Sequence, residues 1–285
     1  MSFDYNNLTV GIIGTGTMGL QLAECFISHG IDVLMKTRNL DKCATVYEKL
    51  QSRMAKRYKA DVIKIYLSRL TICSEYIDLR RCQIVVESVI ENMDVKQTTI
   101  SELSKICGDD TILATNTSAL SVTELSQFVQ YPNKFVGMHF FNPAFKMKLV
   151  EIVKTDKTDV ETLDTVMKVA ELLDKDPIIV RDSPGFLVNY LLLPQINNAI
   201  RMLECGVANM EEIDLAIKEG LNHAMGPFEL ADFIGLDVCY NILLEMNEKF
   251  PNSNFQPAEM LRLLVQEGKL GYKTSVGFYK YPRIK

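Results

Sequence analysis

The amino-acid sequence predicts an α/β protein in which a doubly wound parallel sheet is followed by a smaller all-helical domain. Two observations support this prediction. Short apolar runs alternate with helix-length segments through the first two-thirds of the chain, which is typical of βαβ units. Beyond the Ser-Pro-Gly sequence at 183–185 no convincing strand follows. We therefore place the domain boundary near Pro184, which gives domains of residues 1–184 and 185–285.

The expected strands are only a few residues long and almost entirely apolar, as in a parallel sheet that is covered on both faces. They are Leu8–Ile13, Ile31–Met35, Ile84–Glu87, Ile112–Ala114 and Phe135–Met138.

Helices are expected where apolar residues recur at helical spacing. In the first domain these segments are Met18–His29 and Asp94–Ile106, and a charged stretch from Lys42 to Arg69 predicts one or two helices that project from the sheet. In the second domain we expect helices within Phe186–Gly206, Met210–Gly220 and Ala258–Gly268.

Composition excludes several classes of function. The chain has 285 residues, is 47% hydrophobic and 24% charged, and carries a net charge of −5. This charge does not favour nucleic-acid binding, which needs a positive surface. We see no basic, apolar leader at the N-terminus and no run long enough to span a bilayer. The seven cysteines form no CxxC pair and the three histidines are dispersed, so we expect no metal site and a reducing, cytoplasmic location.

A glycine-rich motif follows the first expected strand and opens the first helix. It reads Gly14-x-Gly16-x-x-Gly19, with Thr17 and Met18 at the start of the helix. The first glycine permits a tight turn, the second lets the backbone approach a pyrophosphate, and the third lets the helix pack on the sheet. With the phosphates facing the helix N-terminus, this context predicts a dinucleotide-binding site. The alternative is a strand-to-helix turn without a ligand.

The residues after the second expected strand bear on the choice of dinucleotide. An acidic residue there would bind the ribose hydroxyls of NAD, but this chain has Lys36, Thr37 and Arg38. A guanidinium can bind a 2′-phosphate that a carboxylate would repel. We therefore expect NADP(H) to be favoured over NAD(H), with Thr37 and Arg38 at the site. The alternative is that Lys36 and Arg38 are solvated surface charges.

Three polar segments lie at or near the ends of the later strands and at the domain boundary. The first is Ala-Thr-Asn-Thr-Ser-Ala-Leu-Ser at 114–121, and the second is Gly-Met-His-Phe-Phe-Asn-Pro at 137–143, followed by Met-Lys-Leu-Val-Glu at 147–151. The third is Asp-Ser-Pro-Gly-Phe-Leu-Val-Asn at 182–189. With these motifs the sequence resembles the 3-hydroxyacyl-CoA dehydrogenases, particularly the short bacterial 3-hydroxybutyryl-CoA dehydrogenases. The resemblance extends to segments 222–237 and 271–279 and so covers nearly the whole chain.

The resemblance implies a Rossmann-like first domain and an enzyme that interconverts a 3-hydroxyacyl thioester and its 3-keto form with a nicotinamide cofactor. It implies that Ser118, His139, Glu151 and Asn189 are catalytic. Chemistry gives compatible roles, because an imidazole can accept the hydroxyl proton near neutral pH and a carboxylate can fix its tautomer. Ser118 and Asn189 would bind and polarise the substrate oxygen.

Each of these residues also has a plainer interpretation. His139 could be structural, Glu151 a charge at the sheet edge, Ser118 a helix N-cap, and Asn189 a hydrogen-bonded polar residue inside a helix.

The resemblance further places Glu91, Lys96 and Asn116 near the nicotinamide and its ribose. The alternative for Lys96 is a solvated charge on the following helix. We also expect a homodimer, because a helical second domain this small must cover its remaining apolar face, and the family implies the same.

The chain departs from the family in ways that concern the substrate. The charged segment 42–69 is shorter than the family element that holds coenzyme A, although Lys56 and Lys59 remain candidates for binding its phosphates. Tyr190 replaces a usual arginine, and Lys146 adds a charge to a usually apolar stretch. These departures leave open a hydroxyacyl unit carried by an acyl carrier protein in natural-product biosynthesis. A protein that only binds NADPH, or a structural protein, is a further alternative.

Overall fold

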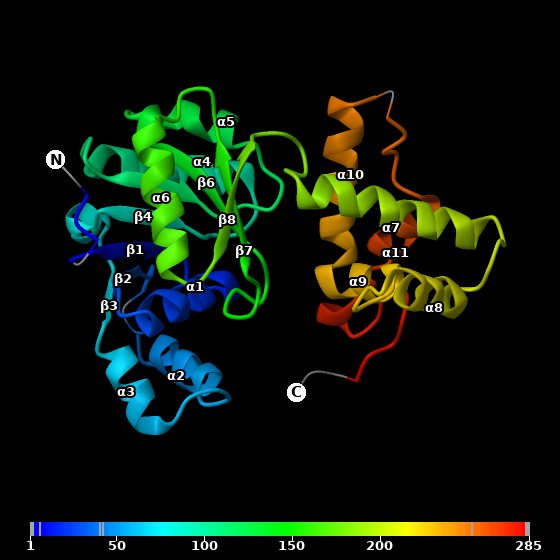
Figure 1. The fold of residues 1–285 in the computed structure, drawn as a ribbon, viewed down its shortest axis with the longest axis horizontal. Coiled ribbons are helices and arrows are strands. Elements are labelled where there is room, and N and C mark those ends of the chain that lie inside the picture. Colours follow the sequence, from blue (N-terminus) through cyan, green and yellow to red (C-terminus); the bar gives the residue numbers. More distant parts are fainter. Residues whose placement is uncertain (1–2, 6, 40, 42, 252, 283–285) are drawn as a thin grey trace. The chain divides into compact units, whose positions relative to one another are not determined.

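The structure is a computed structural model, and it describes residues 3–5, 7–39, 41, 43–251 and 253–282. The chain divides into two compact units, residues 1–182 and 183–285 (Figure 1). The sequence placed the boundary after residue 184.

The first unit contains one eight-stranded sheet in the order β3-β2-β1-β4-β5-β6-β7-β8. All neighbouring strands are parallel except β6 and β7, which pair antiparallel. The sheet with helices on its faces confirms the predicted α/β class and the Rossmann-like arrangement of the first unit. The strands that the sequence predicted are β1 (Thr9–Ile13), β2 (Asp32–Lys36), β4 (Ile84–Glu87), β5 (Ile112–Thr115) and β6 (Phe135–Phe140).

Three further strands were not predicted, namely β3 (Leu70–Cys73), β7 (Leu149–Lys154) and β8 (Asp176–Arg181). Two of them, β3 and β8, are the edges of the sheet. Edge strands are partly exposed, so they lack the continuous apolar run of a central strand. The strand β7 carries a glutamate at its centre, which interrupts the apolar pattern.

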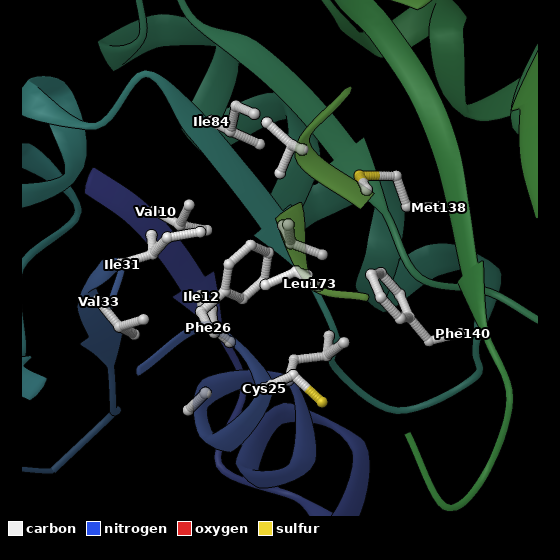
Figure 2. Packing of buried hydrophobic residues seen from close by; sticks show 14 of the residues in the cluster. Val10, Ile12, Cys25, Phe26, Ile31, Val33, Ile84, Met138, Phe140 and Leu173 are labelled. Atoms are coloured by element: carbon white, nitrogen blue, oxygen red, sulfur yellow. The ribbon is translucent and has the colours of Figure 1, made fainter. Parts of the chain in front are cut away.

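Helices α1 (Thr17–Ser28) and α6 (Val160–Leu172) pack on one face of the sheet. Alternate residues of the central strands, such as Val10 and Ile12, point into this layer, as expected for a period of two. Figure 2 shows part of this cluster, with Phe26 of α1 among the sheet residues. Helix α4 (Met93–Ile106) contacts the sheet at β4 and β5 through its own buried residues.

The charged segment after β2 forms two helices, α2 (Cys43–Met54) and α3 (Ala60–Leu67). Lys42, where the prediction began, lies outside the described residues. Apolar residues of both helices join the core cluster with α1. An ion pair adds to this packing, since Arg57 donates to the buried Glu24 of α1.

The second unit is helical, as predicted. It consists of α7 (Val188–Glu204), α8 (Met210–Leu221), α9 (Pro227–Ile234), α10 (Leu236–Lys249) and α11 (Glu259–Gln266). Of these, α9 and α10 were not predicted from periodicity. No helix in the described ranges has the length and hydropathy that a membrane crossing requires. All seven cysteines are free thiols.

Candidate active site

The glycine-rich turn joins β1 to α1. Gly14 has a φ of 111°, and a Cβ there would collide with the carbonyl group of Ser88. A Cβ at Gly19 would collide with the carbonyl oxygen of Gly14. At Gly16, by contrast, no heavy atom lies within 4 Å of the Cβ position, and no side chain caps the exposed start of α1 within the described chain. The turn therefore offers backbone N–H groups and open space, which suits a pyrophosphate.

A hollow of about 580 Å³ adjoins this turn. On one side it is formed by the turn and the start of α1, where Thr17 is exposed and Met18 is half-buried. On the other side it is formed by one face of α2. The lining residues are Thr15, Gly16, Thr17, Leu20, Glu48, Lys49, Ser52 and Arg53.

The two lysines that the sequence suggested for phosphate binding lie elsewhere on this helical pair. Lys56 and Lys59 are exposed between α2 and α3, and neither lines the hollow. Lys49, Ser52 and Arg53 were not predicted as site residues from the sequence. Their signal was present, because residues spaced by three and four share one face of a helix.

The three residues at the end of β2 differ in exposure: Lys36 and Thr37 are buried, and Arg38 is exposed. Lys36 is only 8% exposed, and its Nζ lies 4.1 Å from the centre of the Tyr76 ring. Thr37 is buried, and its hydroxyl donates to the carbonyl oxygen of Asn39 at 3.3 Å. Arg38 is exposed. The interpretation of Lys36 as a solvated charge is therefore wrong, and only Arg38 keeps its charge at the surface.

A buried ion pair joins the ends of β4 and β5 to helix α4. The Nζ of Lys96 donates to both carboxylate oxygens of Glu87, at 2.9 and 3.0 Å, and to the carbonyl oxygen of Asn116 at 3.0 Å. The side chains of Lys96 and Glu87 are both fully buried. The interpretation of Lys96 as a solvated charge is therefore wrong. Glu87 was not singled out from the sequence, although a charge that ends an otherwise apolar strand was a usable signal.

Glu91 organises the backbone around Ser118. Its Oε1 accepts hydrogen bonds from the hydroxyl of Thr117 at 2.6 Å and from the N–H of Ser118 at 2.7 Å. Ser118 does not cap a helix, because the N-cap of α5 (Val122–Leu125) is Ser121. The N-cap alternative for Ser118 is therefore wrong.

Asn116 connects three strands. Its Oδ1 accepts from the N–H of Phe140 at 3.1 Å, and its Nδ2 donates to the hydroxyl of Ser88 at 3.4 Å. Because Ser88 follows β4, Asn116 follows β5 and Phe140 ends β6, this amide ties together the strand ends that surround the site.

His139 and Glu151 form a buried pair across the antiparallel strands. They are direct register partners in β6 and β7, and His139 Nδ1 lies 2.6 Å from Glu151 Oε2. The side chain of His139 is 5% exposed and that of Glu151 is fully buried. A carboxylate only accepts hydrogen bonds, so Nδ1 of a neutral imidazole carries the proton and donates to Glu151. Nε2 is then the nitrogen that can accept a proton. Glu151 is thus no solvated charge at the sheet edge.

Two polar side chains form hydrogen bonds to the loop after His139. Neither was predicted as a site residue from the sequence. Gln21 of α1 donates to Asn142 Oδ1 at 2.8 Å and accepts from the N–H of Ala144 at 2.5 Å. Lys175 donates to the carbonyl oxygens of Ala144 and Met147, at 2.5 and 2.9 Å. Neither residue lies near the loop in sequence, so no local pattern could have indicated these contacts.

Asn189 belongs to the second unit. It lies in the first turn of α7 and is half-buried. Among the described residues, no three metal-ligating side chains gather anywhere in the chain. A larger hollow, of about 730 Å³, lies at the β3 edge of the sheet and contains none of the predicted site residues.

Comparison with known proteins accounts for both units. The family model described as the 3-hydroxyacyl-CoA dehydrogenase NAD binding domain matches residues 9–183, and the model for the C-terminal domain of the same enzymes matches residues 185–281. The chain belongs to the 3-hydroxyacyl-CoA dehydrogenase family.

Individual members of the family are similar over nearly the full length. A 3-hydroxybutyryl-CoA dehydrogenase of Clostridioides difficile is 40% identical over 280 residues, covering 96% of this chain and 99% of that protein. A mitochondrial hydroxyacyl-coenzyme A dehydrogenase of Rattus norvegicus is 38% identical, with 95% and 90% covered. The crystal structure of an (S)-3-hydroxybutyryl-CoA dehydrogenase from Ralstonia eutropha has a TM-score of 0.90 at 37% identity, with 96% and 99% covered.

The two substitutions that distinguish this dehydrogenase within its motifs have different surroundings. Tyr190 packs edge-on against Phe250 and Phe255, with ring centroids 5.8 and 5.4 Å away. It therefore contributes to an aromatic cluster of the second unit. Lys146 is exposed in the loop between β6 and β7.

Proposed function

We propose that this protein catalyses the oxidation of a 3-hydroxyacyl-CoA to the 3-ketoacyl-CoA and the reverse reduction, with His139 as the acid–base residue. The observation that carries the proposal is the 2.6 Å contact between Glu151 and His139, which lies near the carboxyl end of β6. The same sheet contains β1, which leads into the dinucleotide-type turn. Ligands of such sheets bind at the carboxyl ends of the strands.

In the oxidation, Nε2 of His139 takes the proton of the substrate hydroxyl. Glu151 keeps the proton on Nδ1 and stabilises the imidazolium that forms. A nicotinamide bound at the glycine-rich turn would supply the hydride acceptor. In the reduction, the imidazolium returns its proton to the carbonyl oxygen, so one residue serves both directions.

Ser118 and Asn189 are proposed to donate hydrogen bonds to the substrate oxygen and so to polarise the carbonyl. For Ser118, the supporting observation is that Glu91 fixes its backbone N–H. Asn189 is proposed through the family motif at the start of α7. Glu91, Lys96 and Asn116 are proposed to form the cofactor edge of the site.

The proposed cofactor is NADP(H) in preference to NAD(H). The fit rests on the glycine turn, together with the absence of a carboxylate at 36–38 and the exposed guanidinium of Arg38. Lys36 is buried with its Nζ over the Tyr76 ring, and the hydroxyl of Thr37 already donates to Asn39. The 2′-phosphate would therefore be bound by Arg38. Steady-state kinetics with both cofactors test this directly. In Arg38→Asp, kcat/KM with NADPH should fall by about tenfold to a hundredfold, the cost of a charge-assisted hydrogen bond. A parent enzyme that prefers NADH would overturn the proposal.

For the thioester carrier we propose coenzyme A, with its phosphates bound by Lys49, Ser52 and Arg53 in the hollow beside the turn. These side chains provide cationic and hydroxyl donors on a concave surface. Lys56 and Lys59 do not line this surface. The acyl-carrier-protein alternative is not favoured, since the relatives are named for coenzyme A substrates.

We further propose a homodimer formed through the second unit. Several apolar side chains of this unit are strongly exposed, which is costly unless a partner covers them. They include Leu191, Val207, Leu215 and Leu221, which are 55–66% exposed.

The function is tested by following reduced cofactor during reduction of acetoacetyl-CoA. His139→Ala should lower kcat by about a hundredfold to ten-thousandfold, the usual contribution of general acid–base catalysis. His29→Asn is the matched control, because His29 ends α1 and bonds to the Cys25 carbonyl. Full activity in His139→Ala, or none in the parent enzyme with any 3-ketoacyl thioester, would refute the proposal.

A further inference from the structure

Three charged side chains meet where β4, β5 and α4 converge. Lys96 contacts both oxygens of Glu87, and its Nζ also lies 3.5 Å from Glu91 Oε2. Glu87 receives two more hydrogen bonds, from the hydroxyl of Thr115 at 2.6 Å and from the N–H of Val89 at 2.7 Å. With two carboxylates and one ammonium, the cluster has a net charge of −1.

Burial of such a pair is poorly explained by stability alone. Moving two charges out of water costs free energy, and the attraction between them often does no more than offset this cost. Apolar residues of similar size frequently stabilise a fold as well or better. Glu87 and Lys96 are nevertheless completely buried, and Glu87 ends a strand whose other residues are apolar. The directions of their hydrogen bonds indicate another role.

The cluster bonds mainly to one short segment, residues 115–119. Lys96 holds the carbonyl oxygen of Asn116, and Glu91 holds the N–H groups of Ser118 and Ala119, at 2.7 and 3.2 Å. This segment carries the proposed cofactor residue Asn116 and the proposed substrate residue Ser118. Asn116 in turn accepts from the N–H of Phe140, the residue after His139.

We propose that Glu87 is a positioning residue of the dehydrogenase. It fixes Lys96 in place as a buried cation, and Lys96 then sets the position of the Asn116 carbonyl and so of the cofactor side of the site. The inference rests on the proposed function for the identity of the ligands. Glu87 touches neither cofactor nor substrate in this scheme, and it acts only through Lys96 and the 115–119 backbone.

The test separates positioning from stability by neutralising both partners. Glu87→Gln alone leaves a buried ammonium without its counter-ion and is expected to unfold more easily. The double variant Glu87→Gln/Lys96→Met keeps the shapes and removes both charges, so its Tm should stay within a few degrees of the parent. Because Lys96 is itself a proposed cofactor residue, the affinity of the double variant for reduced cofactor is compared with that of Lys96→Met, by fluorescence titration without substrate. Both should bind about tenfold more weakly than the parent and equally well, since Glu87 acts only through Lys96. Lys105→Met is the matched control, since Lys105 lies exposed on the same helix.

A double variant that folds, binds reduced cofactor as tightly as the parent and keeps its kcat would overturn the proposal. Glu87→Asp leaves Lys96 in place, keeps the charge and withdraws the carboxylate by one methylene, so its affinity for reduced cofactor should also fall. Unchanged cofactor affinity in Glu87→Asp would then overturn the proposal. Because the titration needs no acyl substrate, its outcome is independent of whether the parent enzyme oxidises 3-hydroxyacyl-CoA.

Discussion

Glu151 lies directly opposite His139 across the antiparallel pair β6–β7, with 2.6 Å between Oε2 and Nδ1. Opposite residues of an antiparallel pair point to the same face of a sheet. The carboxylate therefore meets the imidazole because of the register between β6 and β7, which are neighbours in the sheet.

The first prediction concerns this pair. In Glu151→Gln, the amide can no longer favour Nδ1–H or stabilise an imidazolium, so kcat should fall by about a hundredfold while KM for the thioester changes little. The pH dependence of kcat should change as well, since the proton acceptor loses its partner. Glu161→Gln, an exposed position at the start of α6, serves as the control. A Glu151→Gln enzyme with the parent's kcat and pH profile would exclude Glu151 from the mechanism.

The second prediction concerns Gln21, which supports the loop after His139. Gln21→Leu is similar in size but leaves the N–H of Ala144 and the amide of Asn142 without this partner. The free energy of unfolding should fall by about 1–3 kcal/mol, the cost of leaving a buried polar group unsatisfied. Chemical denaturation measures the change. Asn7→Leu, at an exposed position of the first unit, controls for adding an apolar side chain. Equal stabilities of Gln21→Leu and the parent would show that the loop does not depend on α1.

The central fold could be predicted from the sequence because β1, β2, β4, β5 and β6 are buried and apolar. The edge strands β3 and β8 could not, because exposure on one side removes that pattern. At the site, motifs led to His139, Glu151 and Ser118. Gln21 and Lys175 could not be found in the same way, because Gln21 and Ala144 are 123 positions apart and only the folded sheet brings them together.

The third prediction distinguishes two sets of phosphate-binding residues. Lys49→Gln with Ser52→Ala should raise KM for acetoacetyl-CoA by about tenfold, with kcat little changed, since charged hydrogen bonds to phosphate are lost. The same change should not affect an acyl-pantetheine substrate, which lacks the nucleotide phosphates. Arg53 is left intact, because it lies 3.7 Å from the buried Glu24 and its removal would disturb that carboxylate.

Two comparisons complete the experiment on the hollow. Lys64→Gln, on the exposed side of α3, should leave KM unchanged. If Lys56→Gln with Lys59→Gln raises KM for the coenzyme A ester and Lys49→Gln with Ser52→Ala does not, the phosphates bind outside the hollow and the proposed assignment is wrong.

The fourth prediction concerns the pH dependence of the second unit. Asp232 is 1% exposed and receives hydrogen bonds from the N–H groups of Phe278 and Tyr279 and from the hydroxyl of Tyr281. Burial raises the pKa of Asp232 above its ordinary value of 3.8, although the hydrogen bonds oppose this effect. The folded state therefore binds a proton more tightly than the unfolded state. Stability from this group is fully present below the ordinary carboxyl pKa and is lost as pH rises through the raised pKa.

Thermal unfolding across this acidic range should show a smaller pH dependence in Asp232→Asn than in the parent. Asp232→Asn should also lower stability near neutral pH by about 1–3 kcal/mol, because an amide cannot accept all three hydrogen bonds. Asp164→Asn, an exposed position on α6, should change neither quantity, and an unaltered pH dependence in Asp232→Asn would show that this carboxyl titrates alike in both states.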